Sequence, residues 1–173
     1  MNEPSVDAKP TLPIKDDDHV AGPDSAAVTV VAYCDFECPY CGRAYPLIKQ
    51  LQARLGDRLR IVFRHFPLTH KHPLAQQAAE ATEAADAQGQ FWAMHDLLFE
   101  NQEVLEKDDL YVYAESLDLD VGRFARELVD RDLRSGQQSG VTGTPTFFMN
   151  GVRHTDEETL KRLVLGMNER RPA

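Results

Sequence analysis

Residues 34–42 read Cys-Asp-Phe-Glu-Cys-Pro-Tyr-Cys-Gly and lie between two different patterns. The apolar run Val28–Tyr33 before them predicts a central strand that is buried on both faces. After them, apolar residues recur at helical spacing as far as Leu55. Two cysteines, Cys38 and Cys41, are therefore placed where a strand ends and a helix begins.

The start of a helix favours a thiolate. The first backbone N–H groups have no partner within the helix and the helix dipole is positive there, so we expect the pKa of Cys38 to fall below the free value of about 8.5. Pro39 suits the first helical turn because its missing N–H is not needed there. Cys41 lies about one turn further on, close enough to attack a mixed disulfide on Cys38 and release the partner.

The motif Phe-x-Cys-Pro-Tyr-Cys-Gly between a predicted strand and a predicted helix resembles the DsbA-like branch of the thioredoxin-fold disulfide oxidoreductases. The resemblance implies a protein-disulfide oxidoreductase whose catalytic, redox-active disulfide joins Cys38 and Cys41. It also implies that Pro39 and Tyr40 lie beside the substrate. Neither a cofactor nor a metal ion is expected.

A second segment, Gly140–Met149, contains a predicted strand that Pro145 directly precedes. Gly140 and Gly143 indicate a tight turn that exposes the backbone. The resemblance implies a cis peptide bond between Thr144 and Pro145, facing the cysteine pair, where the Thr144 backbone can pair with an extended substrate segment.

The predicted elements follow the order of an α/β thioredoxin fold with an inserted helical subdomain. A second strand, Leu59–Phe66, follows the first helix, and a right-handed crossover makes the two strands parallel. Helical patterns fill residues 73–138, between the second strand and the cis-proline loop, which is too long for a plain crossover. Residues 1–22 are expected to be a mobile N-terminal arm and residues 23–173 the thioredoxin-like domain.

Three predicted elements complete the chain. The last helix of the insertion spans Val121–Leu133. Asn150-Gly151 predicts a hairpin turn into a short edge strand, Val152–His154. A final helix is expected from Glu158 to about Asn168.

Two positions depart from the family pattern. Ala32 stands where thioredoxin-like enzymes often carry a buried carboxylate that helps move the proton of the resolving thiol. Asp35 and Glu37 are near but on the loop, where we expect them to be more solvated, and Glu37 is the candidate for proton transfer at Cys41. Tyr40 stands where the most oxidising members carry His, so we expect a redox potential between about −120 mV and about −270 mV.

Other interpretations of the cysteines stay open. Cys38 and Cys41 could be half of a zinc site, although no second ligand pair is visible. Cys34, Cys38 and Cys41 together resemble the iron–sulfur motif of radical enzymes that use S-adenosylmethionine, although such barrels usually need over about 200 residues. The chain could also be a non-catalytic thioredoxin-fold binding protein. Cys34 itself is expected to be a small buried residue, or to form a regulatory disulfide with Cys38.

The composition argues against two classes of partner. With 173 residues and a net charge of −9, the chain can form one domain and has little attraction for nucleic acid or an anionic membrane. No apolar run approaches a membrane span and no signal-type segment is seen, so we expect a cytoplasmic protein, or a periplasmic one if a targeting segment was removed. The expected partners are protein thiols and disulfides, and a recycling partner of the thioredoxin, glutathione or membrane-oxidase type.

The histidines are interpreted as structural. Asp16-Asp17-Asp18-His19 is read as a solvated acidic turn rather than a metal patch. His65, His70 and His72 are expected to be surface or packing residues rather than metal ligands. His95 lies on an apolar helix face and is expected to be a core residue.

Overall fold

The computed structural model describes residues 13–119, 136–149, 152–155 and 160–161. Its strands are β1 (His19–Ala21), β2 (Val28–Cys34), β3 (Leu59–His65), β4 (Thr146–Met149) and β5 (Val152–His154). Its helices are α1 (Pro39–Leu55), the 3-10 turn η1 (Gly56–Arg58), α2 (Ala75–Asp86), α3 (Phe91–Glu100) and α4 (Lys107–Ser116).

The strands form one five-stranded sheet in the order β1-β3-β2-β4-β5. β2 and β3 are parallel, as predicted, with Val30 opposite Ile61. The other pairs, β1–β3, β2–β4 and β4–β5, are antiparallel. β2 is therefore the central strand, and its carboxyl end delivers the chain to the cysteine loop.

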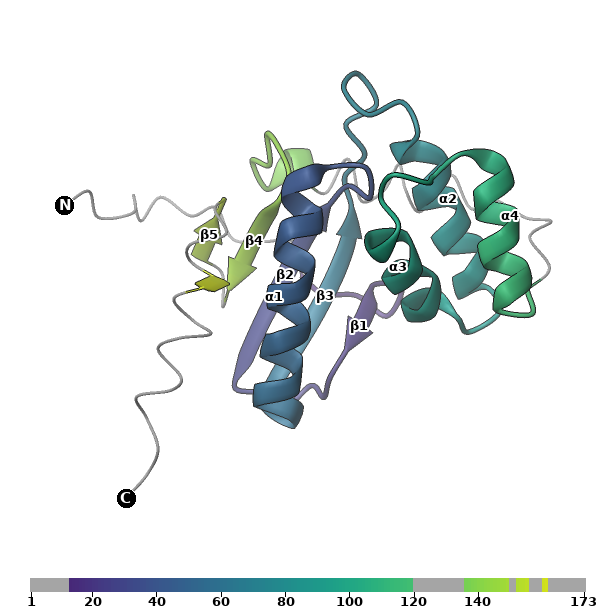
Figure 1. Ribbon diagram of the computed structural model, residues 1–173. Helices are drawn as coiled ribbons and strands as arrows, with labels where there is room; N and C mark the ends of the chain where they lie inside the picture. Colours follow the sequence, from purple (N-terminus) through teal and green to yellow (C-terminus); the bar gives the residue numbers. More distant parts are fainter. Residues whose placement is uncertain (1–12, 120–135, 150–151, 156–159, 162–173) are drawn as a thin grey trace.

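The helices lie in two places relative to the sheet. α1 crosses over β2 and β3, whereas α2, α3 and α4 gather beside the edge that β1 forms (Figure 1). Within the described residues, α2, α3 and α4 follow β3 in the chain and precede β4, so the predicted thioredoxin fold with a helical insertion is confirmed.

Both faces of the sheet are buried. On the α1 side, Val30 of β2 and Phe63 of β3 belong to the same apolar cluster as Leu51 of α1. On the other side, Val31 and Tyr33 of β2 belong to a second cluster. The continuous apolar pattern of β2 is explained by this two-sided burial.

The arm prediction is wrong for residues 19–21, which form β1 and pair with β3. The preceding residue, Asp18, makes a two-pronged ion pair with the buried guanidinium of Arg64, with oxygen–nitrogen distances of 2.9 and 2.7 Å. The Tyr33 hydroxyl accepts a further hydrogen bond from Arg64 at 2.9 Å. Polar side chains that look solvated in the sequence thus anchor this segment to the sheet.

Several predicted elements lie outside the described residues. They are residues 1–12 of the arm, the helix Val121–Leu133, the turn Asn150-Gly151 and most of the final helix. Leu160 and Lys161 of that helix are described and helical, and Leu160 is fully buried in the α1-side cluster.

Candidate active site

The cysteine pair lies at the amino end of α1. Cys38 is the residue before the first helical turn, and Pro39 occupies the first helical position, as predicted. Cys41 follows within the first turn, and its side chain is hydrogen-bonded to that of Cys38. Both are free thiols with only 3% and 1% of their surface exposed, whereas Tyr40 between them is 58% exposed.

The proline loop faces this pair. The Thr144–Pro145 peptide bond is cis, as the family resemblance implies. The thiol of Cys38 donates to the carbonyl oxygen of Thr144 at a sulfur–oxygen distance of 3.5 Å. Thr146 fixes the loop from the other side, since its hydroxyl donates to the carbonyl of Gly143 at 2.7 Å. The structure therefore brings together Cys38, Cys41 and Thr144.

Both thiols hold their protons more tightly than a free cysteine. The pKa of Cys38 is raised above its usual 9.0, first by the hydrogen bond with Cys41 and then by burial. Burial is the main cause that raises the pKa of Cys41. The two sulfurs titrate as a pair, because a thiolate on one opposes ionisation of the other.

The expected low pKa of Cys38 is thus wrong for the dithiol. Thr144 lowers the pKa of Cys38, and the helix start also acts in the expected direction, since the backbone N–H of Cys41 lowers it as well. These effects are smaller than those of the neighbouring thiol and burial.

Cys34 lies against the second cysteine of the pair rather than the first. Its side chain is a hydrogen-bonding neighbour of Cys41 and is one of the causes that raise the pKa of Cys41. It is buried, as expected, with 7% of its surface exposed. Cys34 and Cys41 also line one cavity of about 250 Å³ under α1, together with Ala32, His95 and other residues.

The two acidic residues of the loop are structural anchors. Asp35 is 2% exposed, so the expected solvation is wrong for this residue. Its carboxylate accepts from the amides of Glu37 and Leu68 at 2.8 Å each and contacts His72 Nδ1 at 2.7 Å. The carboxylate of Glu37, the proposed proton-transfer group, accepts from the Leu74 amide at 2.7 Å. Both side chains tie the cysteine loop to the segment between β3 and α2.

Gln102 is a contributor that the sequence reasoning missed. Its Nε2 donates to the carbonyl oxygens of Phe36 and Cys38, at 2.5 and 3.0 Å. It also explains Gly42, because a methyl group added at Gly42 would overlap the Gln102 amide. No spacing signal could have found this residue, since Gln102 follows α3 and lies 64 positions beyond Cys38.

The histidines predicted as one group near the end of β3 are separated by the fold. His65 is buried against Glu83, with an Nε2–Oε1 distance of 2.8 Å. His72 contacts Asp35, and His70 is exposed. His95 is a core residue as expected: burial lowers its pKa, and Nδ1 lies 3.0 Å from the carboxylate of Asp96.

The iron–sulfur interpretation of the three cysteines fails on the fold. Radical enzymes of that type are built on barrels of parallel strands, whereas this chain forms an open five-stranded mixed sheet. Among the described residues, the metal-ligating side chains that lie within 4.8 Å of one another are His19, His65 and Glu83, and the group contains no cysteine.

The chain belongs to the thioredoxin family, and the family match covers residues 15–165. It is 54% identical over 147 residues to the Na(+)/H(+) antiporter NhaA 3 of Salinispora tropica, covering 80% of this chain and 22% of that protein. It is 51% identical over 156 residues to the Na(+)/H(+) antiporter NhaA 1 of Salinispora arenicola, covering 86% of this chain and 24% of that protein. The chain thus spans about a quarter of these relatives.

Solved structures share the fold. The catalytic domain of Proteus mirabilis ScsC aligns with a TM-score of 0.74 at 18% identity, covering 87% of this chain and 88% of that one. Wolbachia pipientis alpha-DsbA1 aligns with a TM-score of 0.71 at 17% identity, covering 90% and 92%. A periplasmic thioredoxin-like protein from Salmonella enterica serovar Typhimurium aligns at 0.73 and 18% identity, covering 86% and 88%. None of the helices described here has the length and apolar character needed to cross a membrane.

Proposed function

We propose that this chain is a thiol–disulfide oxidoreductase that exchanges a Cys38–Cys41 dithiol with the disulfides of protein substrates. The observation that carries the proposal is the contact of Cys38 with two groups at once. Its sulfur is hydrogen-bonded to the Cys41 thiol and lies 3.5 Å from the Thr144 carbonyl oxygen. Cys41 can form a disulfide with Cys38, and the backbone of Thr144 is the segment beside which a substrate would bind.

In the reducing direction, Cys38 loses its proton and its thiolate attacks one sulfur of a substrate disulfide. A mixed disulfide forms and the other substrate sulfur leaves as a thiolate. Cys41 then loses its proton and attacks Cys38, which closes the Cys38–Cys41 disulfide and frees the second substrate thiolate. Two electrons pass to the substrate. The reverse sequence oxidises a substrate dithiol, and a recycling partner of the thioredoxin, glutathione or membrane-oxidase type restores the starting form.

The substrate-binding surface is proposed to consist of Pro39, Tyr40, Thr144 and Pro145. Tyr40 supports this, because a large aromatic side chain that is 58% exposed beside a buried thiol offers apolar contact area to a polypeptide. The guanidinium of Arg43 lies over the Tyr40 ring, 4.4 Å from its centroid, and holds the ring in place.

Insulin reduction and reactivation of scrambled ribonuclease test this function. Cys38→Ser should abolish both activities, because no mixed disulfide can form on serine. Cys34→Ser is the matched control, since it removes a buried thiol of the same neighbourhood and should keep most of the activity. Equal rates for the wild type and Cys38→Ser would refute the proposal.

A second candidate function is a non-catalytic binding domain that keeps the fold but not the chemistry. The burial of both sulfurs favours it, since only 3% of Cys38 is exposed. This function predicts that Cys38 and Cys41 form no disulfide with each other at any ratio of reduced to oxidised glutathione. A Cys38–Cys41 disulfide that forms reversibly in such buffers would exclude it.

A further inference from the structure

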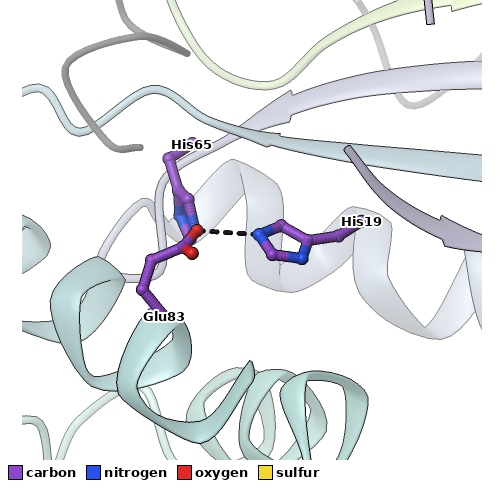
Figure 2. A group of neighbouring side chains, drawn as sticks. All are labelled: His19, His65 and Glu83. Carbon is purple, nitrogen blue, oxygen red and sulfur yellow. Dashed lines mark hydrogen bonds and ion pairs between the residues drawn. The ribbon is translucent and has the colours of Figure 1, made fainter. Parts of the chain in front are cut away.

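Three side chains from distant parts of the chain converge beside the inserted helices. His19 comes from β1, His65 from the end of β3 and Glu83 from α2 (Figure 2). Both imidazoles direct Nε2 at the same carboxylate oxygen, Glu83 Oε1, at 2.7 and 2.8 Å. All three side chains are buried, and one ligand atom from each lies within 4.8 Å of the others.

We propose that His19, His65 and Glu83 form a binding site for a divalent transition metal ion, Zn²⁺ foremost. Two imidazole nitrogens and one carboxylate are a ligand set that Zn²⁺ takes in proteins. Ligands about 2.0–2.1 Å from a tetrahedral metal lie about 3.3 Å apart. The distances from the two imidazole nitrogens to Glu83 Oε1 are about half an ångström shorter than this. A metal ion that replaces the hydrogen-bonding protons therefore requires only small side-chain movements.

One oxygen of the Glu83 carboxylate has no hydrogen-bond partner within the described part of the chain. This oxygen, Oε2, is buried. A buried oxygen without a partner destabilises the folded protein, and a bond to a metal ion would offset that cost. Hydrogen bonds within the cluster therefore leave one acceptor unsatisfied.

The surroundings of His19 fit a metal ligand. Its second ring nitrogen, Nδ1, lies 3.5 Å from a carboxylate oxygen of Asp86. Ligand histidines commonly give their second ring nitrogen to a carboxylate, which fixes the ring orientation. The ring also stacks on Phe91, with a centroid distance of 3.6 Å and an interplanar angle of 8°. Nε2 is thereby held toward Glu83.

An acidic pocket of about 280 Å³ reaches one of the three ligands, His19. His19 is part of its lining, together with Asp16, Asp17, Asp18 and Asp86. Asp18 is paired with Arg64, and the other three carboxylates of the pocket, Asp16, Asp17 and Asp86, raise the local concentration of cations. The segment Asp16–His19, which looks like a solvated turn in the sequence, thus supplies part of the pocket lining and a ligand. A bound ion would clamp β1 to β3 and to α2.

Zinc titration of the full chain tests the site. We would use Cys38→Ser/Cys41→Ser as the background, because thiolates bind Zn²⁺ themselves. Calorimetry should give one Zn²⁺ per chain in this background, and Glu83→Gln and His65→Gln should each weaken binding at least tenfold. His70→Gln, an exposed histidine outside the cluster, is the matched control and should change the affinity less than twofold.

A measurement without cluster substitutions covers the case in which a variant misfolds. In the same background, Zn²⁺ should shift the NMR signals of the His19 and His65 ring nitrogens and leave those of His70 in place. Absence of binding would overturn the proposal. So would binding that survives the loss of Glu83 and His65, or that moves only the signals of other histidines. Insulin reduction by the wild type is a separate readout, and its outcome does not bear on the metal site.

Discussion

The sulfur of Cys38 lies 3.5 Å from the carbonyl oxygen of Thr144, although 106 positions separate the two residues in the chain. The contact exists because β2 and β4 are neighbours in the sheet, with Tyr33 opposite Thr146. The cysteine loop follows the carboxyl end of β2 and the proline loop precedes the amino end of β4. Because these strands are antiparallel, both loops lie at the same end of the sheet. The candidate active site is therefore a consequence of strand order.

The raised pKa of the thiol pair predicts slow alkylation near neutral pH. The rate with iodoacetamide should rise with pH and keep rising beyond pH 9.0, the ordinary value for Cys38, because only the thiolate reacts. The folded pKa lies above the unfolded one, so folding favours the protonated thiols. Their contribution to stability is present below pH 9.0 and is lost as the pH rises above it. A rate that levels off below pH 7 would contradict this account.

Replacing Tyr40 by histidine should make the pair more oxidising. An imidazolium at this position lowers the pKa of Cys38, but a thiol whose pKa starts well above its usual 9.0 stays mostly protonated near pH 7. A stabilisation of about 1.4 kcal/mol corresponds to about 30 mV for a two-electron couple only when the thiolate is fully populated, so we expect a smaller shift, below about 30 mV. The potential is measured by equilibration with glutathione buffers. Tyr111→His, at another exposed tyrosine, is the control and should leave the potential unchanged.

Gln102→Ala should loosen the cysteine loop. It removes the two hydrogen bonds to the carbonyls of Phe36 and Cys38, and we expect a loss of about 1–3 kcal/mol in the free energy of unfolding. Gly42→Ala should act through the same contact, because its methyl group displaces the Gln102 amide. Denaturant unfolding of the single and double variants checks this.

The double variant shows whether Gly42→Ala and Gln102→Ala destabilise the protein through the same contact. If both substitutions act on one contact, Gly42→Ala costs less in the Gln102→Ala background than in the wild type. Strictly additive losses would show that Gly42 is needed for another reason. Gln50→Ala, at an exposed position of α1, should have little effect on stability.

Asp18→Asn should destabilise the protein strongly. It leaves the Arg64 guanidinium buried without its carboxylate, and breaking such a pair costs about 3–5 kcal/mol. Asp24→Asn breaks the ion pair with Arg60, in which the Asp24 side chain is 89% exposed, and should cost less than about 1 kcal/mol. Similar unfolding midpoints for the two variants would show that the Asp18 segment is not anchored.

Local sequence patterns predict the helix and strands that carry the site. They do not predict contacts between residues that are far apart in the chain. The start of α1 at Pro39 and its end at Leu55 follow from a proline at the first turn and a glycine after the last. β2 and β3 follow from apolar runs. The structural roles of Gln102 and His19 could not be predicted in this way, because each is a polar residue whose hydrogen-bond partner lies more than 60 positions away.

The errors about Asp35 and the thiol pKa have a related cause. A carboxylate in a loop is solvated unless the fold covers it. Here the segment after β3 folds over Asp35 and contacts its Oδ2 through Leu68 and His72, while Oδ1 accepts from the Glu37 amide of the loop itself. The helix-start argument for Cys38 considers one thiol alone. The pKa of Cys38 is raised first by Cys41, whose hydrogen bond with Cys38 has a larger effect than the helix start.

The most direct test of the central claim is thiol counting by mass spectrometry after equilibration of the full chain across a series of glutathione buffers. We predict that Cys38 and Cys41 lose their free thiols together in one two-electron transition, with a midpoint between about −120 mV and about −270 mV, while Cys34 stays free. If Cys38 and Cys41 remain thiols at every poise, or if the disulfide that forms contains Cys34, the proposed redox pair is contradicted.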